Sequence, residues 1–230
     1  MTTLALEKLD TLTLCTGAGT LDSGALCVMQ AVDYVTSGGT SDHPECASTA
    51  ITKFLIRWND SLPSDADRDR LLRPLIADVV GTRTTDADEL TRSWLAYDWL
   101  VRVQMVAWMR LTPSLVVHAD AVAALAPIAS KAAMDAAWPT IASARDASSA
   151  AWTAAGAAAG AAAGDAAGAA ARAAARDAAG DAAGAAAWDA ARDAAWAAVG
   201  AALADTVAAL QVSAQQLVRD MCAVGREVAS

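Results

Sequence analysis

Every fourth residue from Trp152 to Gly200 is glycine, tryptophan or arginine, and alanine fills most of the positions between them. Alanine has the highest helix propensity, so this stretch is predicted to be helical. Each of its seven periodic glycines costs a helix about 0.8–1 kcal/mol relative to alanine, and contacts with other helices must offset that cost. Small residues four apart let two helix backbones approach closely. The period therefore predicts closely packed helices.

The same period limits the length of any single helix in this stretch. A step of four residues turns an ideal helix about 40° beyond a full turn, so the periodic positions move steadily around the axis. One straight helix could not keep all of them against one partner. We expect the chain to fold back into two or three shorter helices, with breaks near Gly164–Asp165 or Gly180–Asp181.

The periodic positions are the predicted interface residues, and their contacts could form within the chain, between copies, or both. The glycines would be contact points. The tryptophans could fill gaps against the N-terminal helices, which is the favoured role, or form an exposed surface for a partner. The predicted interface consists of Trp152, Gly156, Gly160, Gly164, Gly168, Gly180, Gly184, Trp188 and Trp196.

Charge and hydropathy narrow the classes of partner. A net charge of −9 and an isoelectric point near 4.6 argue against a sequence-independent grip on nucleic acid, which needs a basic surface. The longest uncharged stretch, residues 147–164, is mainly alanine, glycine and serine, which is too weakly apolar for a membrane span. Residues 1–10 lack the pattern of a secretory signal, so we expect a cytoplasmic protein with reduced cysteines.

Helix start and stop signals divide the remaining chain. The predicted helices cover residues 22–36, 45–58, 65–80, 84–111, 112–125, a short segment between Pro127 and Pro139, and residues 202–224. Pro74 is expected to kink or split the third helix. Residues 11–14 alternate like a strand, but no second strand is evident, so an extended arm is favoured. The fourth helix is predicted to bury a stripe made of Leu90, Trp94, Trp99, Val101, Met105 and Trp108. The alternative is a ligand groove lined by Trp94, Tyr97, Trp99 and Trp108.

These patterns predict an all-α fold, a multi-helix bundle with close-packed alanine- and glycine-rich C-terminal helices. We expect an N-terminal arm over residues 1–22 and a helical core over residues 23–146. An alanine-rich helical segment over residues 147–230 is expected to pack on that core. Most bulky apolar residues precede residue 140, which places the main core in the N-terminal part.

One cluster of residues suits metal or nucleophile chemistry. Cys27, His43 and Cys46 could supply three ligands to zinc, and a cysteine beside a histidine could act as nucleophile and base. The favoured interpretation is simpler, because no CxxC pair makes the spacing specific: His43 hydrogen-bonds its loop and both cysteines fill the space beneath. No phosphate-binding loop, catalytic triad or metalloprotease motif occurs, so no catalytic residue and no cofactor is assigned.

Three short motifs occur in order ahead of the alanine-rich stretch: CVMQAVDYV at 27–35, SDHPECAS at 41–48 and WNDSLP at 58–63. The chain resembles an uncharacterised family of actinobacterial and phage proteins that has Cys-x-Met-Glu-Ala, Ser-Asp-His-Pro-x-Cys and Asn-Asp motifs and an alanine-rich tail. The resemblance covers about residues 10–125, and Gln30 stands where that family usually has glutamate. It implies an intracellular protein of bacterial or phage origin, with no assigned activity.

The sequence thus favours a non-enzymatic interaction or assembly protein that associates with itself or with another protein. The periodic small residues motivate this hypothesis, because they make a poor independent core but a good interface. The alternative is a ligand- or metal-binding helical domain, enzymatic or not, with its site around Cys27, His43 and Cys46.

Overall fold

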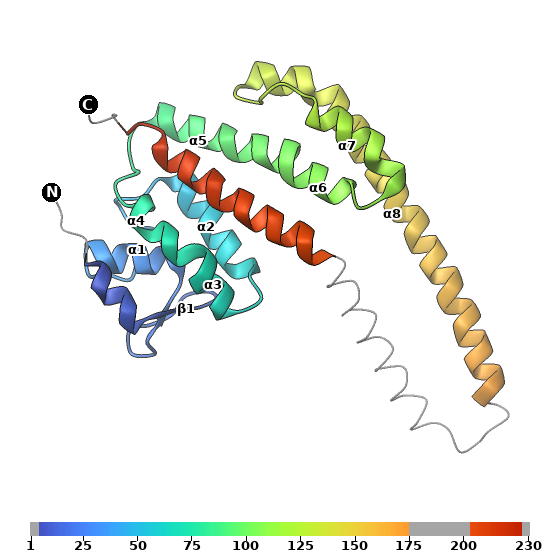
Figure 1. Ribbon diagram of the computed structural model, residues 1–230, viewed down its shortest axis with the longest axis horizontal. Coiled ribbons are helices and arrows are strands. Elements are labelled where there is room, and N and C mark those ends of the chain that lie inside the picture. Colours follow the sequence, from blue (N-terminus) through green and yellow to red (C-terminus); the bar gives the residue numbers. More distant parts are fainter. Residues whose placement is uncertain (1–4, 175–202, 227–230) are drawn as a thin grey trace. The chain divides into compact units, whose positions relative to one another are not determined.

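The computed structural model describes residues 5–174 and 203–226, with side chains described for residues 5–154 and 203–226. This part of the chain is mostly helical, which confirms the all-α class (Figure 1). It forms two compact units. The first contains residues 5–101, 126–135 and 211–226, and the second contains residues 102–125, 136–174 and 203–210. This division differs from the expected one, because the N-terminal arm and the end of the chain both belong to the first unit.

The helices keep the labels of Figure 1. They are α1 (Val28–Thr36), α2 (Thr49–Ser61), α3 (Asp65–Leu72), α4 (Ile76–Val79), α5 (Asp86–Trp99), α6 (Val106–Met109), α7 (Val116–Ala123) and α8 (Lys131–Ala174). Short 3-10 turns cover Leu6–Thr11, Arg73–Leu75 and Pro113–Leu115, and a π-helical segment covers Leu100–Met105. Residues 203–223 form the C-terminal helix.

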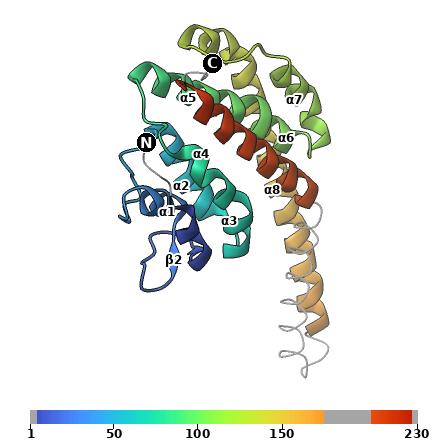
Figure 2. The same cartoon turned by 60° about the vertical axis from the view of Figure 1, so that its left-hand side comes forward.

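The N-terminal segment forms a strand with a partner, so the prediction of an unpaired arm was wrong. Strand β1 (Thr13–Leu14) pairs in parallel with β2 (Ala25–Leu26), and Leu14 lies opposite Leu26 (Figure 2). The stretch before α1 is therefore extended and does not begin a helix at residue 22 as predicted. α1 begins only at Val28 because the Cys27 side chain caps it.

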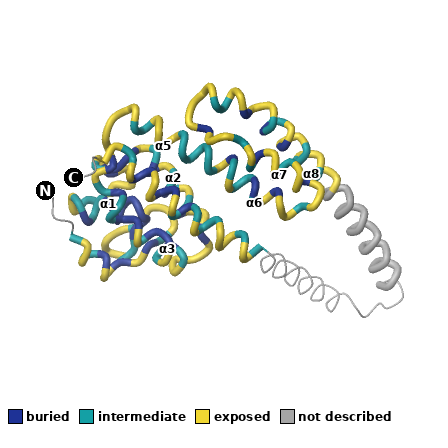
Figure 3. The backbone as a smooth tube through the Cα atoms, turned by 45° about the horizontal axis from the view of Figure 1, so that its top comes forward, coloured by how far each residue is buried: buried dark blue, intermediate teal, exposed yellow. Residues whose placement is uncertain are grey.

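In the first unit, four apolar side chains in and just before α1 are buried: Leu26, Met29, Val32 and Val35. Met29, Val32 and Val35 pack with residues of α2, α3 and α4 in one hydrophobic core. Figure 3 shows buried stretches in α1, α2 and α3. The C-terminal helix runs alongside α5 and closes the core with Leu217, Val218, Met221 and Cys222 (Figure 1).

Two predicted helix boundaries lie next to prolines. The predicted start of α2 was wrong, and the predicted split at Pro74 is confirmed. α2 begins at Thr49 with Ser48 as its cap, whereas the predicted helix began at residue 45, directly after Pro44. The Ser48 hydroxyl accepts a hydrogen bond from the Ile51 amide, so the cap decides the start. Pro74 splits the third predicted helix as expected, because a proline has no N–H to donate to the helix ladder.

The predicted stripe on the fourth helix is only partly buried. Val101 is buried, but Leu90 and Trp108 are exposed. The most deeply buried side chain of α5 is instead Arg92, which is 0% exposed. Its guanidinium donates to the Met221 and Val224 carbonyls near the end of the C-terminal helix. Arg92 lies about 200° around the helix from Leu90, so the buried face of α5 is opposite to the one that carries Leu90 and Trp94.

In the second unit, α6 packs against α7, and α8 contributes further buried side chains. The buried residues are Val106, Met109, Leu115, Ala119, Val122, Ala137, Ile141 and Ala144. An ion pair between Arg110 and Asp120, 2.9 Å long, links the end of α6 to α7.

α8 runs without a break for 44 residues, so two predicted interruptions were wrong. Pro139 lies inside the helix, and the helix continues through Gly164–Asp165. Relative to alanine, the proline costs the helix about 3 kcal/mol and the glycine about 1 kcal/mol, and the helix nevertheless continues through both positions. The other predicted break, Gly180–Asp181, lies outside the described residues.

Candidate functional site

The three predicted metal ligands have different places and local roles: Cys27 lies at the start of α1, and His43 and Cys46 lie in the loop between α1 and α2. Cys27 is 5% exposed and is the N-cap of α1, where its sulfur accepts a hydrogen bond from the Gln30 amide at 3.4 Å. His43 is exposed, with its Nδ1 2.8 Å from Asp42 Oδ1. The Cys46 sulfur is half-buried and lies 3.9 Å from the Thr36 hydroxyl.

This geometry does not support the zinc hypothesis. Within residues 5–154 and 203–226, no group of three or more His, Cys, Asp or Glu side chains is arranged to hold a metal ion. His43 is bonded to the neighbouring Asp42, and Cys27 is buried.

Gln30 organises the chain around Cys27, a role that the sequence analysis did not assign. Its Oε1 accepts hydrogen bonds from the amides of Cys27 at 3.0 Å and Gly19 at 2.9 Å. Its Nε2 donates to the carbonyls of Gly19 at 3.2 Å and Thr40 at 3.1 Å. The buried amide thus joins three chain segments, and it needs both its acceptor and its donors to do so.

Asn59 has a comparable role at the end of the two-stranded sheet. Its Nδ2 donates to the Cys15 carbonyl at 2.9 Å, and its Oδ1 accepts from the Val28 amide at 3.4 Å. The side chain therefore takes the place of the next rung of the ladder beyond Leu14 and Leu26. Because Asn59 lies on α2, it ties the sheet to the helical core.

Cys15 and Cys27 extend the register of the sheet by one residue. The Cys15 amide donates to the Leu26 carbonyl at 3.0 Å, which is the bond expected of a parallel pair between residues 15 and 27. Burial raises the pKa of both thiols, and at Cys27 the neighbouring Asp42 and Cys15 raise the pKa further. Both side chains are therefore held as thiols at neutral pH.

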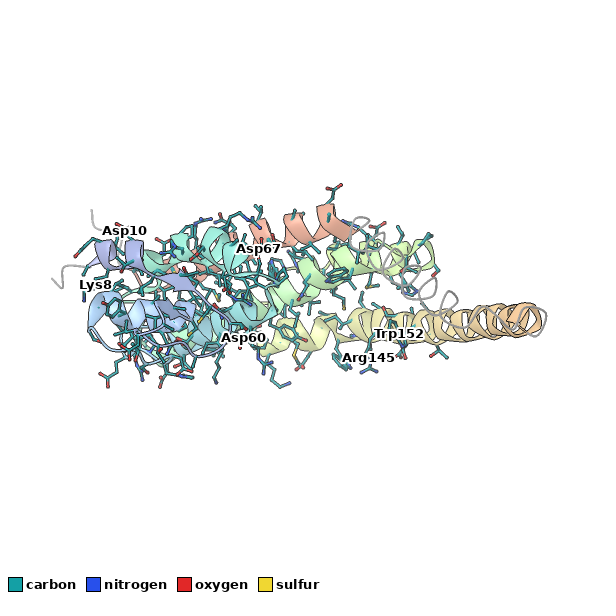
Figure 4. The ribbon with its side chains drawn as sticks, turned by 90° about the horizontal axis from the view of Figure 1, so that it is seen from below. Lys8, Asp10, Asp60, Asp67, Arg145 and Trp152 are labelled. Carbon is teal, nitrogen blue, oxygen red and sulfur yellow. The ribbon has the colours of Figure 1, made fainter. Side chains whose placement is uncertain are left out.

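The predicted interface is described in part. Trp152 is 82% exposed on α8, so for this residue the exposed-surface interpretation fits and the favoured gap-filling one does not (Figure 4). Gly156, Gly160, Gly164 and Gly168 lie within the α8 helix. The remaining predicted positions lie outside the described residues: Gly180, Gly184, Trp188 and Trp196.

Other large apolar side chains in the second unit are also exposed. They are Val103, Trp108, Leu111, Val116, Val117 and Trp138 on or beside α6, α7 and α8, with Val207 at the start of the C-terminal helix. Trp138 has a cationic neighbour, since Arg145 lies 5.8 Å from the centre of its ring. Trp152 is the most exposed large apolar residue of this group.

Comparisons with known proteins add no family assignment: no family model, no curated protein and no solved structure matches this chain. In the part of the chain that the structure describes, no helix combines the length and the apolar character that crossing a membrane requires.

Proposed function

We propose that this protein is a non-enzymatic helical interaction protein that associates with a second copy of itself through α8. The observation that carries the proposal is the exposure of Trp152. Burying a tryptophan removes about 150–250 Å² from water, and at about 25 cal/mol per Å² this stabilises a contact by about 4–6 kcal/mol. A two-fold symmetric pair would gain this contribution twice.

The α8 helix also provides the space that such a ring needs. Gly156 and Gly160 follow Trp152 by one and two turns of the same helix. Because each four-residue step leaves a residual rotation of about 40°, the three positions lie within an arc of about 80° and share one face. Glycines on that face let a facing helix approach closely, with room for the tryptophan of the other copy.

The absence of charged side chains around Trp152 favours this stretch of α8 as the contact between two copies. Two chains of net charge −9 repel each other, so contact is easiest where charged side chains are absent. Residues 147–164 contain no charged residue and include Trp152, Gly156 and Gly160. The four-residue spacing of ring and glycines also matches only a helix with the same spacing, which this chain itself provides.

Sedimentation equilibrium of the full chain over a wide concentration range tests the proposal. We expect a monomer–dimer equilibrium whose dissociation constant rises about 100-fold or more in Trp152→Ala, which corresponds to about 2.7 kcal/mol. Trp138→Ala is the matched control, because it removes an exposed tryptophan from the same helix outside the period. A monomeric wild type, or equal effects of both substitutions, would contradict self-association through this face.

A second variant tests whether the contact needs the space above the glycines or only apolar surface. Gly160→Leu adds a bulky side chain to the proposed face, while leucine favours the helix more than glycine does. We expect helicity by circular dichroism to be kept or raised and dimerisation to be weakened. Tighter association in this variant would show that the glycines do not form the contact.

A further inference from the structure

The strands β1 and β2 bring two cysteines together that are twelve residues apart in sequence. The register places Leu14 opposite Leu26, and the amide of Cys15 continues the ladder with a 3.0 Å bond to the Leu26 carbonyl. Cys15 and Cys27 are therefore neighbours across a parallel pair. Paired strands lie about 4.8 Å apart at Leu14 and Leu26, and Cys15 and Cys27 each follow by one residue. A disulfide spans Cα separations of about 4.4–6.8 Å, so the pair lies near the range that such a bond requires.

Fixed contacts on both sides hold the two cysteines in this register. Asn59 binds the Cys15 carbonyl and the Val28 amide, and Gln30 binds the Cys27 amide. The Cys15 sulfur also lies close to Gly19, since a Cβ on that residue would be 2.8 Å from it. Gly19 is bonded through both its amide and its carbonyl to Gln30. The same buried amide thus positions the surroundings of both thiols.

The other two cysteines are placed differently. Cys46 is half-buried next to Thr36, and Cys222 is buried in the core on the C-terminal helix. Neither is paired in register with another cysteine among the described strands. Cys222 is 1% exposed in the hydrophobic core, and burial raises its pKa to about 11.

We infer that Cys15 and Cys27 form a reversible dithiol site that a low-molecular-weight disulfide, such as glutathione disulfide, oxidises to an intramolecular disulfide. The half-buried Cys15 loses its proton and attacks one sulfur of the oxidant, which breaks that S–S bond and releases one reduced thiol. Cys27 then loses its proton, attacks the Cys15 sulfur and releases the second reduced thiol. Two protein thiols are oxidised, one small disulfide is reduced, and the two protein protons end on the released thiols.

The new disulfide would close residues 15–27 into a covalent loop. It would also connect the end of β1 covalently to the N-terminus of α1. The loop has thirteen members by the sequence numbering, so it constrains the unfolded chain substantially. We expect the oxidised protein to melt about 5–10 °C above the reduced one. Redox state would then set how firmly the N-terminal segment is held.

Peptide mapping of the full chain tests this inference. The reduced protein is incubated with glutathione disulfide, blocked with N-ethylmaleimide and cut on the N-terminal side of aspartate, which separates Cys15 (10–21), Cys27 (22–32) and Cys46 (42–59). We expect peptides 10–21 and 22–32 to be joined, with Cys46 and Cys222 alkylated. A lasting glutathione adduct on Cys15 with Cys27 alkylated, a Cys27–Cys46 link, or four alkylated cysteines would overturn the inference.

Two variants sharpen the result. Cys15→Ser removes the attacking sulfur and should abolish both the joined peptides and the rise in melting temperature. Cys46→Ser is the matched control, because it removes another half-buried cysteine and should leave both signals unchanged. If Cys46→Ser abolished the joined peptides, the assignment of the pair would be wrong. Both measurements, the joined peptides and the melting temperature, report a bond within one chain. They therefore do not depend on dimerisation through α8.

Discussion

Side-chain amides, rather than charged groups, organise the region around Cys27. Gln30 and Asn59 each bind backbone groups from separate segments, and each uses a donor and an acceptor at the same time. A carboxylate could accept from the same amides but could not donate to the carbonyls. The difference between an amide and an acid is therefore decisive at these buried positions.

Gln30→Glu tests this point. The carboxylate would face the carbonyls of Gly19 and Thr40 in a buried setting, so we expect a loss of unfolding free energy of about 3 kcal/mol or more near pH 7. Chemical denaturation measures the change. The exposed Gln216→Glu is the control and should change stability by about 0.5 kcal/mol or less. Equal effects would mean that the Gln30 amide contributes little.

The sequence contained a usable signal for the helix cap at Cys27, but none for the alignment of Cys15 with Cys27. Cys27 followed by Gln30 has the spacing of a capping box, with cysteine in the place of serine, and could have been identified as a helix start. The alignment of Cys15 with Cys27 could not, because a strand of two residues has no measurable periodicity. Pairing of such short strands depends on contacts with α2 and α1 that only the folded chain provides.

At the scale of elements, side chains from neighbouring segments satisfy the helix ends. Arg92 donates to the carbonyls of Met221 at 3.1 Å and Val224 at 2.7 Å, near the end of the C-terminal helix. The same guanidinium pairs with Glu89 at 3.0 Å. Glu89 in turn accepts from the Ser48 hydroxyl and the Ala50 amide at the start of α2. This chain of contacts links α2, α5 and the C-terminal helix.

Removing the Arg92 guanidinium should weaken the first unit strongly. In Arg92→Met the two carbonyls and Glu89 lose a buried cationic donor, so we expect a loss of about 3–5 kcal/mol in unfolding free energy. Arg57→Met, an exposed arginine on α2, is the control and should change it by about 0.5 kcal/mol or less. A difference between the two variants below about 1 kcal/mol would argue against this role of Arg92.

The start of α5 should respond to acid through Asp88. Hydrogen bonds from the side chains of Thr84 and Thr85 lower the pKa of Asp88 below its ordinary value of 3.8. The stabilisation is therefore present above pH 3.8 and lost as the pH falls through the folded-state pKa. We expect the stability difference between the wild type and Asp88→Asn to shrink over that window. A difference that stays constant with pH would show that the charge does not contribute.

It was easier to predict which segments are helical than to predict where each helix begins and ends. Apolar spacing located most of the helices, and Pro74 marked a real division. The errors arose at caps and breaks: Ser48 starts α2, Cys27 starts α1, and neither Pro139 nor Gly164 interrupts α8. Local signals compete with the helix tendency of the flanking residues and with tertiary contacts, and spacing alone does not measure that competition.

At the scale of the whole molecule, charge opposes the proposed association. Each chain has a net charge of −9, so two copies repel over distances that salt can screen. We expect the dimer dissociation constant to fall several-fold as the ionic strength is raised from about 0.01 M to about 1 M, because the Debye length shortens from about 30 Å to about 3 Å.

Sedimentation equilibrium at a series of sodium chloride concentrations measures this dependence. Trp152→Ala, run in parallel, reports any salt effect that does not involve the α8 contact. A dissociation constant that rises with salt would mean that ion pairs, rather than apolar contact in the uncharged stretch 147–164, hold the copies together.

The position of Asn59 on α2 has a consequence for the order in which the chain folds. Two residues in each strand form too few bonds to persist alone, and the side chain that completes the ladder belongs to a helix more than thirty residues away from β2. The strands should therefore pair late, after α2 has joined the folding nucleus. Kinetic measurements on Leu14→Ala should give a φ-value near 0, whereas Leu55→Ala on α2 should give a clearly higher value.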